Sequence, residues 1–423
     1  MTGVFDTGRD RAVAMDAADP LAAFRGEFNL PPTRNGLAPV YLCGNSLGLQ
    51  PKRAARYVEE ELQDWARLGV EGHFHARRPW LPYHRNATAD LARLTGARQE
   101  EVVAMNTLTV NLHLLMASFY RPTKERRGIL IESTAFPSDR YAAVSQIRMH
   151  GHDPADALIE WRPRADEALY IEDLRRLLEA RGPEIALVLL PGVQYYNGQV
   201  LDMQAVCAAA RGAGCTVGLD LAHAIGNVPL ALHDWGADFA VWCSYKYLNG
   251  GPGAVAGAFV HAAHHGGDGS RQLLGWWGHD EATRFEMRPE FRPAKGAELW
   301  QLSNPPILSL APVVASLTIF REAGIAALRE KSMRLTAYMD GLLHAVLAGR
   351  IETITPPGAR GCQLSLRLLA GDPKAILRGL AARNVFVDWR EPDVIRAAPA
   401  PLYNGFVDVF EFVARLAAAM EDR

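Results

Sequence analysis

A regular alternation of short apolar segments with amphipathic segments constrains the fold more than any other feature of this sequence. The apolar segments, which we predict to be strands, are residues 102–105, 129–131, 158–161, 185–190, 216–219 and 239–242. The segments between them show helical spacing of apolar residues, as Leu108, Leu112 and Leu115 do. Strands that alternate with helices build a mainly parallel sheet with helices on both faces. The sequence therefore predicts an α/β domain of this kind.

The segments outside this alternation predict a chain of two domains. Residues 16–28 have the pattern of a short helix, and residues 51–68 that of an amphipathic helix that starts at a proline. Residues 262–300 are polar and aromatic without a regular pattern, which is typical of functional or interfacial segments. We expect three parts: an N-terminal segment that packs on the small domain (1–50), a large domain (51–305) and a small α+β C-terminal domain (306–423).

The bulk properties exclude several classes of function. The 423 residues have a formal net charge of −2, so the chain has no strong field to attract nucleic acid or an anionic membrane. No apolar run approaches the roughly 20 residues that span a bilayer, and the N-terminus lacks the apolar core of a signal peptide. Five cysteines at irregular spacings do not form a disulfide framework. We expect a cytoplasmic protein without nucleic-acid or membrane partners, and no metal ion at His73 and His75.

A single lysine, Lys246, follows the last predicted strand in the stretch WCSYKYLNGGPG, between Tyr245 and Tyr247. Ligands of open α/β sheets bind at the carboxyl ends of the strands. Aromatic neighbours desolvate an amine and lower its pKa, and a neutral amine can condense with a carbonyl group. Lys246 is therefore a candidate for Schiff-base chemistry, although a lone lysine in a loop is more often simply solvated.

Other polar residues stand at the ends of predicted strands or at the starts of predicted helices: Asp220, His223, Thr107, Thr109, Ser138 and Asp139. Helix N-termini offer free N–H groups to a phosphate. An aspartate beside a pyridine ring keeps its nitrogen protonated, so the ring can accept electrons. With Lys246, these residues suit pyridoxal phosphate, although each hydroxyl or carboxylate alone could be a helix cap.

Several strings of the sequence together resemble the kynureninase family. They are YLCGNSLGLQPK, NTLTVNLHLLMASFYRPT, ESTAFPSDRYA, DLAHAIGNVPL, SYKYLNGGPG, GWWGH, LSNPPI and IRAAPAPLYN. The resemblance covers nearly the whole chain, from about residue 40 to residue 410. It implies a fold-type I pyridoxal-phosphate enzyme allied to class V aminotransferases, with a large cofactor-binding domain, and a homodimer with shared active sites.

The resemblance also implies roles for individual residues. Cofactor contacts fall on Leu108, Thr109, Phe136, Ser138, Asp139, Asp220, His223, Tyr245, Lys246, Trp276 and Asn304. Among them Phe136 stacks on the cofactor ring and Asp220 pairs with its nitrogen. Tyr245 contacts the phosphate, and Lys246 forms the Schiff base. Trp276 and Asn304 complete the phosphate site across the dimer interface, and Arg396 pairs with the substrate α-carboxylate.

The implied reaction is the hydrolysis of L-kynurenine to anthranilate and L-alanine, a step of tryptophan catabolism. Lys246 removes the α-proton, and Tyr245 is a candidate proton donor. One position departs from the family pattern as we interpret it, because Pro191 stands where a Ser or Thr contact to the cofactor is expected. Two alternatives remain open: a cysteine desulfurase, for which Cys362 is the nearest nucleophile, and a non-catalytic protein that binds pyridoxal phosphate.

Three polar residues implied to lie near the aromatic ring of the substrate bear on its choice. His73, Ser303 and Asn304 can all form hydrogen bonds, which would give partners to a hydroxyl group on that ring. We therefore expect 3-hydroxykynurenine to be accepted at least as well as kynurenine.

Overall fold

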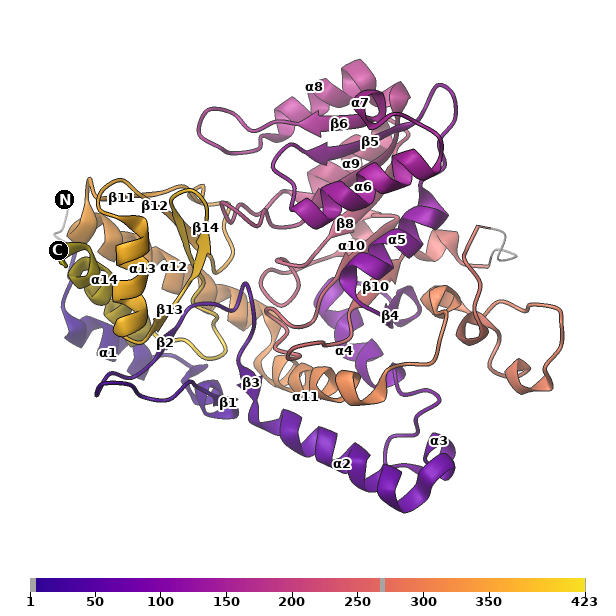
Figure 1. Cartoon of the computed structure of the whole chain (residues 1–423), viewed down its shortest axis with the longest axis horizontal. Coiled ribbons are helices and arrows are strands. Elements are labelled where there is room, and N and C mark those ends of the chain that lie inside the picture. The colour runs from indigo at the N-terminus through magenta and orange to yellow at the C-terminus, as the bar shows by residue number, and fades with distance from the viewer. Residues whose placement is uncertain (1–4, 267–270, 423) are drawn as a thin grey trace.

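The computed structural model describes residues 5–266 and 271–422, and its larger part is built on a seven-stranded sheet (Figure 1). The strand order is β4-β10-β9-β8-β7-β5-β6. The strands are β4 (Val102–Ala104), β5 (Gly128–Glu132), β6 (Leu158–Trp161), β7 (Ile185–Pro191), β8 (Thr216–Asp220), β9 (Phe239–Trp242) and β10 (Gly257–Val260). The run from β9 to β6 is parallel, whereas β10 is antiparallel to both β9 and β4. The predicted α/β class with a mainly parallel sheet is confirmed.

Helices cover both faces of this sheet because successive side chains of a strand point in opposite directions. On β7, Leu187 and Leu189 join one hydrophobic core, and Val188 and Leu190 join the other. The first core lies under α5 (Leu108–Phe119) and α6 (Pro137–Met149). The second lies under α4 (Arg85–Thr95), α8 (Ile171–Arg181), α9 (Met203–Gly212) and α11 (Ile307–Ala323). The short helices α7 (Pro154–Ala157) and α10 (Leu232–Trp235) complete this part.

The smaller part has its own four-stranded antiparallel sheet, ordered β11-β12-β15-β14. Its strands are β11 (Ile351–Thr353), β12 (Leu364–Leu368), β14 (Asp388–Arg390) and β15 (Val394–Ala397). Its helices are α12 (Ile325–Leu347), α13 (Pro373–Ala382) and α14 (Phe406–Glu421). These elements enclose a separate hydrophobic core.

The described part of the N-terminal segment lies against this smaller part (Figure 1). Helix α1 (Arg9–Ala17) packs on α14, and strand β2 (Val40–Tyr41) pairs in parallel with β13 (Val385–Phe386). The chain then crosses through β3 (Gln50–Pro51), which pairs with β1 (Phe28–Asn29), into α2 (Lys52–Leu68) and α3 (Gly72–His75).

The helix predicted over residues 16–28 is wrong. Helix α1 ends at Ala17, and a separate 3-10 helix covers Ala22–Glu27. Pro20 lacks the N–H that a continuous helix would need, and Asp19 instead accepts a hydrogen bond from the backbone N–H of Leu21. The chain turns at this point.

No single helix within the described ranges is long and apolar enough to cross a membrane. Helices α11 and α12 meet that criterion only as a pair, and they are bent by 80° relative to each other.

Candidate active site

A pocket opens at the carboxyl ends of β5, β7 and β8, beside the first residues of α5 and α6. It brings together nine of the residues predicted from the sequence: Leu108, Thr109, Phe136, Ser138, Asp139, Asp220, His223, Tyr245 and Lys246. Five further residues complete its wall: Glu132, Pro191, Val193, Tyr195 and Ala222. Since these residues come from segments far apart in the sequence, the sheet topology creates the site.

Lys246 lies at the wall of the pocket between two aromatic rings. Its Nζ is 6.0 Å from the ring centroids of both Phe136 and Tyr245, and 2.9 Å from Nε2 of His223. Burial, followed by the charge of Lys246, holds the pKa of His223 well below its usual range. His223 is therefore neutral and can accept a hydrogen bond from the lysine amine. Its second nitrogen, Nδ1, is buried without a partner among the described residues.

The loop that carries Lys246 is held by close backbone contacts. The N–H of Gly48 donates to the carbonyl oxygen of Tyr245 over 2.8 Å. A Cβ atom at position 48 would lie 2.4 Å from the carbonyl oxygen of Lys246, so the approach requires glycine. The N-terminal segment thereby fixes the backbone around Lys246.

Two helix starts meet at the wall of the pocket. The hydroxyl groups of Thr109 on α5 and Ser138 on α6 are 2.9 Å apart. The alternative that the hydroxyls of Thr107, Thr109 and Ser138 are helix caps is not supported, because neither helix has a side-chain cap. Both helix starts keep free N–H groups beside paired hydroxyls, which suits a phosphate.

Three carboxyl groups gather on the floor of the pocket. Glu132, Asp139 and Asp220 are 3%, 8% and 8% exposed, and Oδ1 of Asp220 accepts a 2.7 Å hydrogen bond from the N–H of Ala222. Burial, and next the charge of Asp220, raises the pKa of Asp139 well above its usual range. Burial likewise raises the pKa of Glu132 to about 8. At neutral pH, Glu132 and Asp139 therefore keep their protons beside Asp220.

The sequence analysis missed Glu132 and Tyr195. Glu132 is the last residue of an apolar strand. In the sequence, a single carboxylate at that position indicates the end of the strand and does not indicate a site residue. The ring of Tyr195 packs edge-on against Phe136, with centroids 5.2 Å apart. The available signal was position alone, since each follows a buried strand at its carboxyl end.

Arg396 lies beneath the pocket wall and does not line it. The side chain is 1% exposed, Nη1 donates to the carbonyl oxygen of Tyr195 over 2.6 Å, and Nη2 donates to Asp388.

Four predicted residues lie away from the pocket within one chain. Trp276 is 47% exposed, and its Nε1 donates to the carbonyl oxygen of Arg284. Ser303 and Asn304 are exposed as well, and His73 packs edge-on against Trp80. A single subunit does not bring these four residues to Lys246.

Two further predicted positions are Pro191, where the family pattern has Ser or Thr, and Cys362, the nearest nucleophile for a cysteine desulfurase. Pro191 ends β7 opposite Asp220 and lines the pocket, so a residue without hydroxyl or N–H occupies that wall. Cys362 is fully buried, and burial raises the pKa of its thiol to about 12. Such a thiol is not a nucleophile at neutral pH, which argues against a desulfurase.

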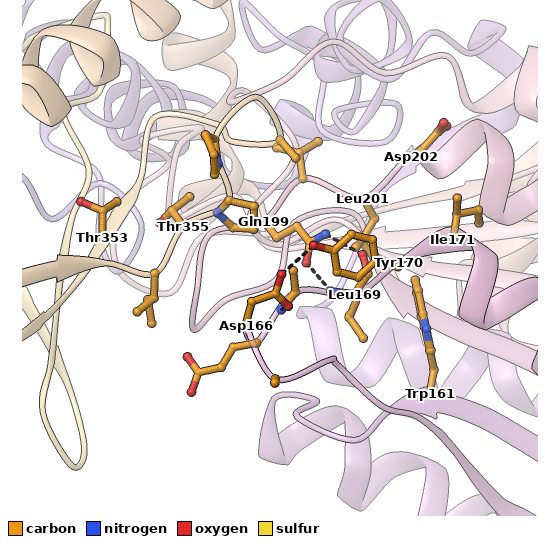
Figure 2. A pocket seen from close by; sticks show the side chains of 18 of the residues that line it. Trp161, Asp166, Leu169, Tyr170, Ile171, Gln199, Leu201, Asp202, Thr353 and Thr355 are labelled. Atoms are coloured by element: carbon orange, nitrogen blue, oxygen red, sulfur yellow. Dashed lines mark hydrogen bonds between the residues drawn. The ribbon is translucent and has the colours of Figure 1, made fainter.

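A larger cavity of about 600 Å³ lies between the two parts of the chain (Figure 2). Its polar groups are largely paired with one another: the hydroxyl of Tyr170 donates to Asp166 over 2.6 Å, and the Gln199 amide pairs with the backbone of Leu169.

A cluster elsewhere in the chain, Glu101 with His233 and His261, has the residue types of a metal site. The two imidazole planes are within 4° of parallel, so their nitrogen lone pairs do not converge on one ion.

Comparisons with known proteins agree with this geometry. Two family models match the chain: Aminotransferase class-V over residues 40–263, and Kynureninase C-terminal domain over residues 328–416. Among solved structures, the cysteine desulfurase from Thermococcus onnurineus superposes with a TM-score of 0.75 at 15% identity, covering 90% of this chain and 95% of that one. The cysteine desulfurase CsdA from Escherichia coli gives 0.75 at 18% identity, covering 95% and 98%. At such identities these structures show the fold alone.

Relatives of known name are much closer in sequence. A kynureninase from Koribacter versatilis is 53% identical over 98% of this chain and 98% of its own length. A kynureninase from Myxococcus xanthus is 54% identical over 98% and 97%. The chain belongs to the kynureninase family.

Proposed function

We propose that this protein hydrolyses the Cβ–Cγ bond of L-kynurenine, giving anthranilate and L-alanine, with pyridoxal phosphate as cofactor. The observation that carries the proposal is full-length identity above 50% to proteins named kynureninase, together with a pocket that surrounds Lys246. The reaction adds water to the γ-carbonyl carbon and breaks the Cβ–Cγ bond, and the β-carbon then receives a proton.

The residues of the pocket fit the cofactor. The hydroxyls of Thr109 and Ser138, with the free N–H groups of their helices, suit its phosphate. Oδ1 of Asp139 and Nδ1 of His223 are buried polar atoms without partners in the described part of the chain, as expected where a polar ring is absent. Asp220 lines the pocket and suits a protonated ring nitrogen. When bound, the cofactor supplies an electron sink for the carbon atoms next to the substrate amine.

The side chains of the chain itself supply the proton transfers. Lys246 would hold the cofactor covalently through Nζ and, once displaced by the substrate amine, take the proton from the α-carbon. Neutral His223, 2.9 Å away, accepts a hydrogen bond from this amine and orients it. Burial raises the pKa of Tyr245, so its phenol keeps the proton that we assign to the β-carbon. We assign Arg396 to the substrate carboxylate, since a guanidinium can pair with it through two hydrogen bonds.

We further propose a homodimer with shared sites. Large apolar side chains on α2 and α3, which lie at the edge of the molecule in Figure 1, are exposed: Trp65 by 60% and Phe74 by 58%. Phe136 and Trp276 are also exposed, by 44% and 47%, although both are assigned to the cofactor. A second copy would cover these surfaces and bring Trp276 and Asn304 to its neighbour's phosphate site.

The remaining assignments are proposals of the same kind. We propose that His73, Ser303 and Asn304 contact the aromatic ring of the substrate, and that 3-hydroxykynurenine is also cleaved. The parts 1–50, 51–305 and 306–423 are our proposed N-terminal segment, large domain and small domain, except that α11 packs in the core of the large part, so the small domain begins at α12. All five cysteines are free, which supports a cytoplasmic location.

The test compares L-kynurenine with L-cysteine as substrates of the purified holoenzyme. We expect anthranilate and L-alanine in equal amounts from the first and no sulfide from the second. Sulfide release would favour the desulfurase alternative. Cofactor absorbance without any product would favour the non-catalytic one.

A further inference from the structure

Three charged residues lie side by side on one face of the small-domain sheet. Asp388 on β14 is directly opposite Arg396 on β15, and Arg390 follows two residues along β14 on the same face. We call Asp388, Arg390 and Arg396 the Asp388 cluster. This face is turned toward the large domain, because Arg396 donates to the carbonyl oxygen of Tyr195 at the pocket wall.

Both arginines share the same carboxylate oxygen. Oδ2 of Asp388 accepts hydrogen bonds from Nη2 of Arg396 and, at 3.3 Å, from Nη2 of Arg390. The side chains of Arg396 and Asp388 are 1% and 9% exposed. The Nε atoms of both arginines are buried without partners within the described residues. The Asp388 cluster therefore has one excess positive charge and unused donors, which is a state that a ligand anion would balance.

The excess charge acts on the pocket. The charges of Arg390 and Arg396 oppose the rise that burial causes in the pKa of Tyr195. After burial and the charge of Lys246, the same two arginines also lower the pKa of His223. Both residues line the pocket, so the Asp388 cluster lies directly behind the wall of the space where a substrate would bind.

We propose that Arg390 is a positioning residue for the substrate carboxylate, and that it acts through Asp388 without touching the substrate. The inference rests on the proposed function and on the assignment of Arg396 to the carboxylate. A ligand carboxylate at Arg396 adds a second negative charge beside Asp388. Arg390 supplies the second positive charge, so that two carboxylates and two guanidinium groups balance. Without Arg390, Asp388 engages Arg396 alone and repels the incoming carboxylate.

The test is the variant Arg390→Gln. We expect KM for L-kynurenine to rise roughly three- to fivefold, with kcat unchanged. A loss of affinity of this size is typical when one partly exposed charge interaction is removed. Arg390→Lys keeps the charge and should recover most of the affinity. The lysine variant also keeps the test informative when the glutamine variant folds poorly. Arg378→Gln on α13, whose side chain is 72% exposed, makes the same change of net charge and should leave KM unchanged.

Two further measurements separate this role from a general effect of charge. Isothermal titration of the holoenzyme should show weaker binding of L-alanine to Arg390→Gln, whereas ethylamine, which lacks the carboxylate, should bind as in the wild type. In an Asp388→Asn background, Arg390→Gln should have no further effect. Equal losses for alanine and ethylamine, or an undiminished effect in the Asp388→Asn background, would overturn the proposal. Because the titrations need no turnover, they separate this proposal from the proposed reaction, which fails only when wild type releases no anthranilate.

Discussion

Replacement of Glu132 by glutamine should make the cofactor-free protein more stable at alkaline pH. The folded protein keeps the proton of Glu132 up to about pH 8, whereas an ordinary glutamate releases it near pH 4.5. The stability linked to this proton is therefore fully present below pH 4.5, and it is lost as pH rises through 8. The difference of about 3.5 pH units corresponds to about 5 kcal/mol when the loss is complete, at about 1.4 kcal/mol per unit.

Glutamine resembles the protonated carboxyl group in shape and carries no charge, so Glu132→Gln should not lose this stability. The assay is urea unfolding of the apo protein at pH 4, 7 and 9, followed by circular dichroism. We expect the variant to match the wild type at the lowest pH and to exceed it by several kcal/mol at the highest. Glu179→Gln, on the exposed face of α8, is the matched control and should follow the wild type. Parallel pH curves for wild type and Glu132→Gln would refute the neutral, buried state of Glu132.

Asp220→Asn should weaken cofactor binding and lower turnover at least about a hundredfold, since an amide cannot balance a protonated ring nitrogen; turnover within a few-fold of wild type would remove Asp220 from the mechanism. Mixed Lys246→Ala and Trp276→Ala chains should regain activity, because each hybrid dimer holds one intact site; mixtures no better than either parent would contradict shared sites. The ratio of kcat/KM for 3-hydroxykynurenine over kynurenine should be at least one and should fall in His73→Trp with Asn304→Thr; a ratio strongly below one that the double change leaves unmoved would exclude selection by these residues.

The fold was largely predictable because apolar residues recur at regular intervals in its helices and form short apolar runs in its strands. The strand–helix alternation predicted six strands of the large sheet, since each must be buried on two faces. Strand β10 was not predicted because its sequence, GAFV, is short and follows a glycine-rich loop. It is also antiparallel to β9, so no helix stands between the two strands to mark its start. The order of strands in the sheet depends on crossovers, which no local pattern records.

Some residues of the candidate site could likewise be predicted from the sequence, and others could not. Residues at strand ends and helix starts, such as Asp220 and Ser138, were found because a parallel sheet gathers those positions at one edge. Glu132 was missed because its importance comes from two neighbouring carboxyl groups that only the folded chain supplies. Trp276 and Asn304 came from the family resemblance, and one subunit does not bring them to the pocket. We propose that their roles depend on a second subunit, which neither local periodicity nor the structure of one subunit displays.

We expect Lys246 to carry the chemistry of this pocket. The most direct measurement is borohydride reduction of the holoenzyme, followed by proteolysis and mass mapping of the modified peptide. We predict one cofactor-derived label per chain, on Lys246, and none in Lys246→Ala treated in the same way. A label on another lysine, or an equal label in the alanine variant, would contradict the account.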